Sequence, residues 1–302
     1  MRWIAARGPW VLVAGILAGL TLPGVAQLLV PFIPVMVATL LFLAALRIGP
    51  SRMRDALVDM PRTVAIVLGM QLAFPMIALL LFGGSHPFAL ALLIIAMAPP
   101  IAGSPNMVSM IGYDPAVAMR YLMTGTALLP LTVIPILFFV PALGGITEVM
   151  AAALRLLYVI LVAGSLAFVL RTTIIKNPPP EVIDGLSALL LAVVVIGLMS
   201  AVNQSLRETP WIFLGWLGFV VLVNFSLQFI GYFATRGRMS QDSVAALTID
   251  AGNRNVALFL VALPSDVIAP LLVFIGCYQV PMYLTPLITG RLLRERRLTT
   301  TK

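Results

Sequence analysis

A helical membrane protein is the fold class that the sequence predicts, with ten transmembrane helices arranged as two inverted five-helix repeats. Three observations support this prediction: the composition, the distribution of positive charge, and two matching interruptions in the apolar segments. Of the 302 residues, 61% are hydrophobic and only 10% are charged, whereas soluble domains contain about 25% charged residues. The net charge of +8 does not indicate nucleic-acid binding, because the basic residues stand singly or in small groups between apolar runs.

Apolar segments long enough to cross a bilayer recur along the whole chain, since about 20 residues suffice for one crossing. They cover residues 8–24, 27–46, 62–82, 87–111, 115–140, 148–171, 182–203, 210–235, 242–263 and 267–291. Glycine, proline and charged residues separate them, as in the charged stretch from Arg47 to Arg62 and the linker from Lys176 to Pro180. Both stretches are predicted to be loops.

The basic residues predict the orientation. If the N-terminus is cytoplasmic, all of the 19 Lys and Arg residues except Arg155, Arg207 and Arg254 fall in inside segments. This asymmetry follows the positive-inside rule and favours ten spans with both ends in the cytoplasm, in the inner membrane if the cell is bacterial. Five spans per half is an odd number, so residues 144–302 are expected to insert upside down relative to residues 1–143.

Two five-residue stretches interrupt the fourth and ninth segments at corresponding places in the two halves. They are Ala102-Gly103-Ser104-Pro105-Asn106 and Ala251-Gly252-Asn253-Arg254-Asn255, and both read Ala-Gly-x-x-Asn. Such paired interruptions are the best sequence pointer to a transporter's binding site. Broken backbone at membrane depth is tolerated where it is buried in protein or lines a wet cavity. A half-helix beginning near Ser104 to Asn106 could hold an anion on its free N–H groups. The alternative is a simple proline kink.

Charged and amide residues at the second interruption are candidates for function, because ionisable residues within a span are costly. Arg254 is expected to place a fixed positive charge in the binding cavity, with Asp250 as a coupling group or counter-ion. The alternative is a neutral structural ion pair, since Asp250 and Arg254 are four residues apart and would share one face of a helix.

Other polar side chains in neighbouring spans support a shared cavity, although each could simply hydrogen-bond between helices. The candidate substrate-binding residues are Ser104, Asn106, Asn253, Arg254 and Asn255. The candidate coupling-ion or proton site consists of Asp250, Asn106 and Gln71, and the supporting polar residues are Thr124, Asn224 and Gln228.

At these two interruptions the chain resembles the bile acid:sodium symporter family and its wider bile-acid, arsenite and riboflavin transporter relatives. The resemblance covers nearly the whole chain and implies a core domain of spans 3–5 and 8–10 and a panel domain of spans 1, 2, 6 and 7. It further implies sodium ligands at Asn106, Asp250 and Gln71. Met119, Met123 and Arg254 occupy other ligand positions, and thioethers and a guanidinium are unsuited to a hard cation.

The function expected from the resemblance and from these departures is secondary transport of a small organic anion, sodium-independent or proton-coupled. The alternatives are a sodium-coupled symporter of bile-acid-like or other organic anions, an arsenite-type efflux carrier, and a non-transporting receptor or scaffold. No enzymatic activity, resident cofactor, metal centre or nucleic-acid partner is expected; Na⁺ or H⁺ would act only as a coupling ion. With one histidine and one cysteine, the chain has no metal-hydrolase motif.

Overall fold

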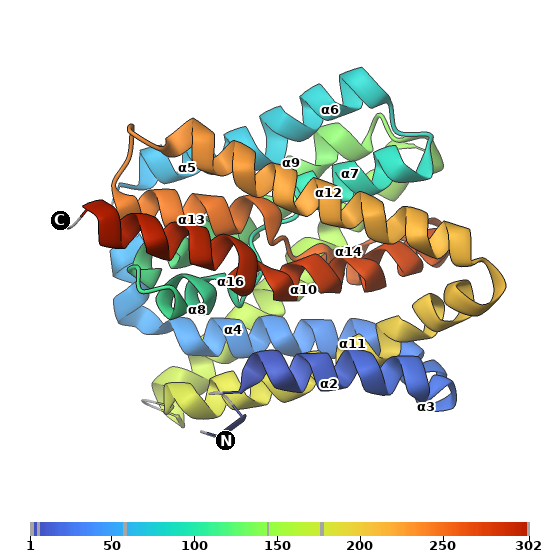
Figure 1. Ribbon diagram of the computed structural model, residues 1–302, viewed down its shortest axis with the longest axis horizontal. Coiled ribbons are helices and arrows are strands. Elements are labelled where there is room, and N and C mark those ends of the chain that lie inside the picture. The colour runs from blue at the N-terminus through green and yellow to red at the C-terminus, as the bar shows by residue number, and fades with distance from the viewer. Residues whose placement is uncertain (1–2, 5–6, 57–58, 144, 176–177, 301–302) are drawn as a thin grey trace. The chain divides into compact units, whose positions relative to one another are not determined.

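The computed structural model describes residues 3–4, 7–56, 59–143, 145–175 and 178–300. Within these ranges the chain is helical, with short interruptions and no strand (Figure 1). The α-helices are α2 (Gly8–Thr21), α3 (Pro23–Leu29), α4 (Ile33–Ala56), α5 (Met60–Leu68), α6 (Phe74–Phe82), α7 (Pro87–Met97), α8 (Ser104–Met110), α9 (Pro115–Leu137), α10 (Ile146–Thr173), α11 (Pro180–Glu208), α12 (Pro210–Thr235), α13 (Gln241–Gly252), α14 (Phe259–Ala262), α15 (Ser265–Ile268) and α16 (Leu272–Thr300). Short 3₁₀ turns join several of them, and the segment η2 (Gly69–Ala73) between α5 and α6 is a π-helix.

Long apolar helices confirm that this is a helical membrane protein. Within the described residues, seven helical segments are long and apolar enough to cross a membrane: Pro23–Arg47, Met60–Phe82, Pro115–Leu137, Ile146–Thr173, Pro180–Glu208, Pro210–Thr235 and Ser265–Leu293. The other three predicted spans, 8–24, 87–111 and 242–263, coincide with shorter or interrupted helices. That these three also cross the membrane stays a prediction.

The predicted loop from Arg47 to Arg62 is largely wrong. Helix α4 continues to Ala56, and α5 begins at Met60. The arginine, methionine and alanine residues of this stretch are good helix formers, and they outweigh its glycine and proline. Lys176 and Asn177 of the predicted linker, and Gly144 at the predicted repeat boundary, lie outside the described residues.

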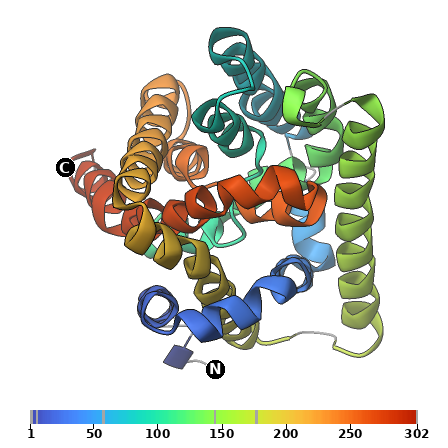
Figure 2. The same cartoon turned by 90° about the vertical axis from the view of Figure 1, so that its right-hand side faces the viewer.

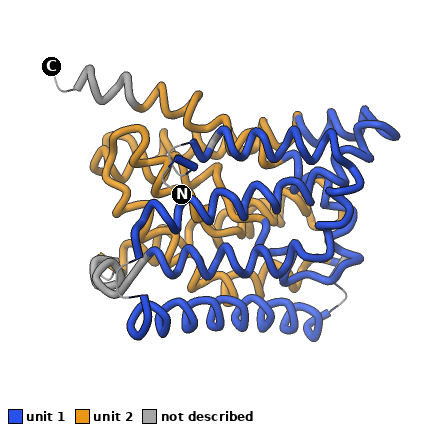
Figure 3. The backbone as a smooth tube through the Cα atoms, turned by 90° about the horizontal axis from the view of Figure 1, so that it is seen from below, with its two compact units in different colours: residues 1–54, 141–217, 257–277 blue, residues 55–140, 218–256, 278–302 orange. Residues whose placement is uncertain are grey.

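The chain divides into two compact units, coloured separately in Figure 3. Unit 1 comprises residues 1–54, 141–217 and 257–277, and unit 2 comprises residues 55–140, 218–256 and 278–302. Each unit therefore takes segments from both halves of the sequence. The predicted panel spans lie mainly in unit 1 and the predicted core spans mainly in unit 2, but residues 257–277 belong to unit 1. The assignment of inverted repeats stays a prediction.

In unit 1, small residues allow α2 to pack closely on α11. A Cβ atom added at Gly19 would lie 2.5 Å from the Cβ of Met199, and one added at Gly15 would lie 2.9 Å from the carbonyl oxygen of Ala192. Glycines one helical turn apart form the kind of small-residue face on which membrane helices approach each other. Helix α10, the yellow-green helix in Figure 2, runs unbroken over 28 residues.

Charged side chains join three helices of unit 1. Arg47 of α4 lies 2.9 Å from the Asp184 carboxylate of α11, and both side chains are mostly buried. Arg171 of α10 donates a hydrogen bond to the carbonyl oxygen of Leu46. Since the pair is partly shielded from water, loss of either partner would leave the other charge unpaired and poorly solvated, which is costly.

We expect a double-mutant cycle on Arg47→Ala and Asp184→Ala to measure a coupling free energy of about 1–2 kcal/mol. Each single variant should also unfold at a lower temperature than the wild type, because it leaves one partly buried charge without its partner. Thermal unfolding of the four purified proteins in detergent supplies the measurement. Strictly additive effects would show that the pair contributes nothing.

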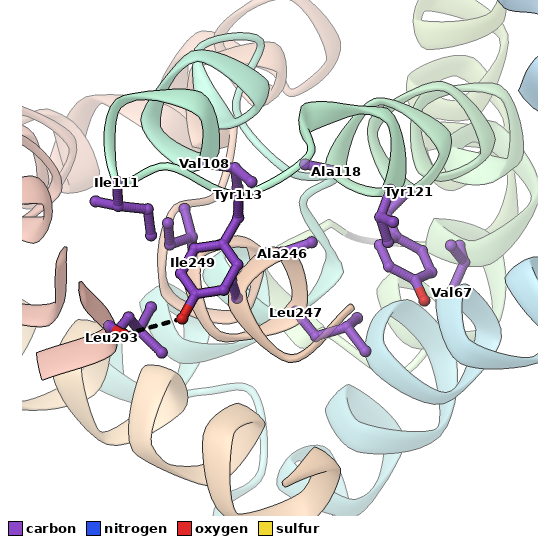
Figure 4. Packing of buried hydrophobic residues seen from close by; sticks show 12 residues of the cluster. Val67, Val108, Ile111, Tyr113, Ala118, Tyr121, Ala246, Leu247, Ile249 and Leu293 are labelled. Carbon is purple, nitrogen blue, oxygen red and sulfur yellow. Dashed lines mark hydrogen bonds between the residues drawn. The ribbon is translucent and has the colours of Figure 1, made fainter. Parts of the chain in front are cut away.

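In unit 2, a hydrophobic cluster holds the segments on which the two helix breaks depend. It includes Val108 of α8, Ile111 directly after α8, Tyr121 of α9 and Ile249 of α13. Figure 4 shows these side chains together, with the hydroxyl of Tyr113 directed at the backbone of Leu293. The Tyr113 hydroxyl donates a 2.9 Å hydrogen bond to that carbonyl oxygen. The cluster thus fixes α8 and α13 against their neighbours.

Candidate functional site

The first break separates α7 from α8 in unit 2. Helix α7 ends at Met97 and α8 begins at Ser104, so residues 98–103 are not helical. Pro99 and Pro100 explain the break, since proline has no N–H and clashes with the preceding turn. The predicted interruption is therefore present.

As an anion site, the N-terminus of α8 is weaker than predicted. Helix α8 spans only seven residues, from Ser104 to Met110, so few peptide dipoles align in it. The N–H of Ser104 already donates to the carbonyl oxygen of Ile101, and Pro105 has no N–H to offer. The N-terminus of α8 is therefore not a good anion-binding group.

The second break follows α13, also in unit 2. Helix α13 continues through Asp250 to Gly252, and Asn253 to Asn255 form a short extended stretch before the chain turns back into a 3₁₀ helix at Val256. No proline lies in this stretch, so the helix persists further than the composition suggests.

The two breaks are joined by antiparallel backbone pairing, as in a minimal β-bridge between Pro100 and Arg254. The N–H of Ile101 donates to the carbonyl oxygen of Asn253 at 2.9 Å, and the N–H of Asn255 donates to that of Pro99 at 2.8 Å. Backbone groups released by a helix break must find partners inside a membrane protein. Each break supplies partners for the other, which makes the pair a single structural feature.

Arg254 holds both breaks through its side chain. The guanidinium is only 3% exposed; its Nε donates to the carbonyl oxygen of Ala251 at 3.2 Å and its Nη1 to that of Ala98 at 3.1 Å. These carbonyls lie at the C-terminal ends of α13 and α7, where the helix dipole favours a positive charge.

Asp250 does not pair with Arg254, so the alternative of a neutral structural ion pair is wrong. Its carboxylate is completely buried, and neither oxygen accepts a hydrogen bond within the described residues. The four-residue spacing fails because α13 ends at Gly252, before Arg254, whose side chain turns to the two carbonyls instead. Arg254 lies near enough to act electrostatically on Asp250, and the Ser104 hydroxyl approaches the carboxylate without hydrogen-bond geometry.

The polar side chains behind the second break form a closed network. Asn224 donates to the carbonyl oxygen of Gly252. Gln228 donates to Asn224 at 2.6 Å and to Thr285 at 3.0 Å, and it accepts from Thr289 at 2.5 Å. Two predicted supporting residues, Asn224 and Gln228, are thus fully engaged in holding the break.

Asn253 belongs to the same network. Its side-chain amide donates to the carbonyl oxygen of Ile249 at 2.8 Å, and its side-chain oxygen accepts from Thr285 at 3.0 Å. Because both groups have partners and the residue is wholly buried, Asn253 acts as a structural residue of the break rather than as a substrate ligand.

On the side of the first break the buried polar groups are unpaired. Gln71 in the π-helix is 1% exposed, and neither atom of its amide has a partner within the described residues. The Oγ atoms of Ser104 and Thr248 are also buried without partners. An ideal Cβ at Gly125 would lie 2.9 Å from Gln71 Nε2 and 3.3 Å from Pro100 Cδ, so the Gln71 amide lies against the break. Since unpaired buried polar groups are costly, they mark where water or a ligand completes the protein.

Three further predicted residues lie on the helices and the break that form this region. Asn106 of α8 and Asn255 of the second break are half-buried, and Thr124 of α9 is buried.

Sequence reasoning missed Tyr278, which closes the second break. Its buried hydroxyl donates to the carbonyl oxygen of Gly252 and accepts from the Arg254 N–H at 3.2 Å. It also missed Thr285 and Thr289 as partners of Asn253 and Gln228. Their spacing of one helical turn within an apolar segment is a weak signal that could have suggested a polar face.

Comparisons with known proteins do not place the chain in a family. No protein-family model matches it, and no curated protein matches it.

Proposed function

We propose that this protein is a secondary active transporter that moves a small organic anion by alternating access without sodium. The proposal includes ten spans in two inverted repeats, 1–143 and 144–302, with both ends in the cytoplasm. The main support for the proposal is that two helix breaks pair with each other beside the buried Arg254 and the buried, unpaired Asp250. A receptor or scaffold has no use for such breaks, whereas they are typical of carriers.

The choice of a sodium-independent mechanism rests on Arg254. Its guanidinium donates to two backbone carbonyl oxygens, which are the ligands that a hard cation prefers. A sodium ion at the same oxygens would be repelled by the positive charge already there. We propose that the guanidinium permanently takes the place of a coupling ion.

If Arg254 stays bound to the two carbonyl oxygens, it does not form an ion pair with Asp250, and the negative charge of Asp250 needs another partner. The groups that act on it are Arg254 in the break, Tyr121 of α9 and the Ser104 hydroxyl of α8. None of them forms an ion pair or hydrogen bond with the carboxylate. A proton or a cationic part of the substrate would supply the missing charge.

Sodium-coupled symport is the second candidate, because the unpaired oxygens of Asp250 and Gln71 suit a hard cation. Arsenite efflux has less support, since the sequence contains a single cysteine, Cys277, and this residue is buried.

A screen for ligand-induced stabilisation distinguishes these candidates. Purified protein is heated with a library of small carboxylates and sulfonates, once in sodium chloride and once in choline chloride at the same pH. We expect the same compounds to raise the unfolding temperature in both salts, and the best of them to be taken up by proteoliposomes without sodium. Stabilisation and uptake that require sodium would contradict the proposal and support symport.

A further inference from the structure

Two opposite charges lie beside the first break without neutralising each other. The Arg254 guanidinium donates to the carbonyl oxygen of Ala98, where the first break begins. The Asp250 carboxylate lies near Ser104, where the first break ends. The two side chains act on each other electrostatically but form no ion pair. All of these residues belong to unit 2.

Neither charge is balanced by a partner of opposite charge within the described residues. Both oxygens of Asp250 are buried and accept no hydrogen bond there, and the hydrogen bonds of the Arg254 guanidinium go to neutral backbone carbonyls. An uncompensated carboxylate removed from water costs several kcal/mol. The described residues therefore supply no partner for the Asp250 carboxylate. A ligand that binds here has to place a positive charge beside Asp250.

A plain organic anion does not meet that requirement. It would balance the charge of Arg254 but would bring a second negative charge towards Asp250, which raises the electrostatic cost. A plain cation would satisfy Asp250 and be repelled by the fixed guanidinium. A molecule that carries both charges satisfies both residues at once.

We propose that the substrate is a small zwitterion, whose carboxylate or sulfonate binds Arg254 and whose ammonium binds Asp250. This inference rests on the proposed transport function and replaces its plain anion by amino acids and aminosulfonates, which carry the same anionic group together with an ammonium. The unpaired amide of Gln71 is a polar group suited to orienting such a molecule. The Asp250 carboxylate then needs no proton and no metal ion, because the substrate itself neutralises it.

Pairs of compounds that differ only in the cationic group test the proposal. Glycine is compared with glycolate, β-alanine with 3-hydroxypropionate, and taurine with isethionate, by calorimetric titration of the purified full-length protein in sodium-free buffer. In the best-binding pair we expect the amino member to bind at least about 10-fold more tightly, as loss of a hydrogen bond to a charged group implies.

Asp250→Asn should abolish this preference and should not weaken binding of the hydroxy member, because it removes the negative charge that opposes a plain anion. Asp242→Asn, which changes an acid on the same helix α13 but outside the site, should keep it. Asp250→Glu should retain the preference for the amino member. If Asp250→Asn does not fold, the proposal is tested by the affinity ratios of the amino and hydroxy members for the wild type and for Asp250→Glu.

Equal or tighter binding of the hydroxy members to the wild type overturns the zwitterion inference while the transport function stands. A preference that persists in Asp250→Asn also overturns it. Absence of binding by every member of the three pairs, together with no hit in the anion library, overturns the proposed transport function itself.

Discussion

Replacing Arg254 by alanine is expected to weaken substrate binding by at least about 30-fold. Truncating one partner of a buried charged contact typically costs about 2–5 kcal/mol, and the lower end of that range corresponds to this factor. The variant loses the positive charge and also the two hydrogen bonds to Ala98 and Ala251, so its unfolding temperature should fall as well. Calorimetric titration with the best compound of the library screen measures the affinity, and thermal unfolding measures the stability.

Two further variants separate charge from structure. Arg254→Lys keeps the charge but not the two-carbonyl geometry, and we expect it to recover part of the affinity and little of the stability. Arg155→Ala removes an arginine of unit 1 that donates to Ala262 and should leave binding unchanged. Wild-type affinity in a folded Arg254→Ala protein would show that Arg254 serves only to join the breaks.

A single methyl group at Gly252 is expected to disrupt the second break. An ideal Cβ at this position would lie 2.4 Å from the carbonyl oxygen of Asn224 and 2.5 Å from Gln228 Cγ. The nearest atom is backbone and cannot move aside, so α13 would have to shift away from α12. Overpacking of this kind costs about 1–3 kcal/mol or more. Gly252→Ala should therefore unfold at a clearly lower temperature and bind substrate poorly.

Gly125→Ala is the matched control for stability. There the nearest atom is Nε2 of the Gln71 side chain, at 2.9 Å, with Pro100 Cδ at 3.3 Å. The end of a flexible side chain can rotate away, so we expect a loss of less than about 1 kcal/mol. Equal destabilisation by the two substitutions would contradict the prediction, because it would show that the close packing of α13 on α12 at Gly252 adds no extra cost.

Much of the architecture could be predicted because it follows from local chemistry. Long apolar segments form the helices that suit a membrane, and Pro99 and Pro100 cannot continue a helix, so the first break lies where the composition places it. The stretch after Arg47 was predicted less well, because residues with high helix propensity continue α4 through a glycine and a proline.

Whether a polar residue of the site is bound or unpaired could not be predicted. That polar and charged residues interrupt two apolar segments at matching places follows from the sequence alone, since helix breaking depends on a few neighbouring residues. The binding of Arg254 to carbonyls of both breaks, the hydrogen bonds of Asn253 and the lack of any at Asp250 are visible only in the folded chain. A hydrogen bond depends on position in space: Arg254 and Ala98 are 156 residues apart in the chain, and no local pattern records that they meet.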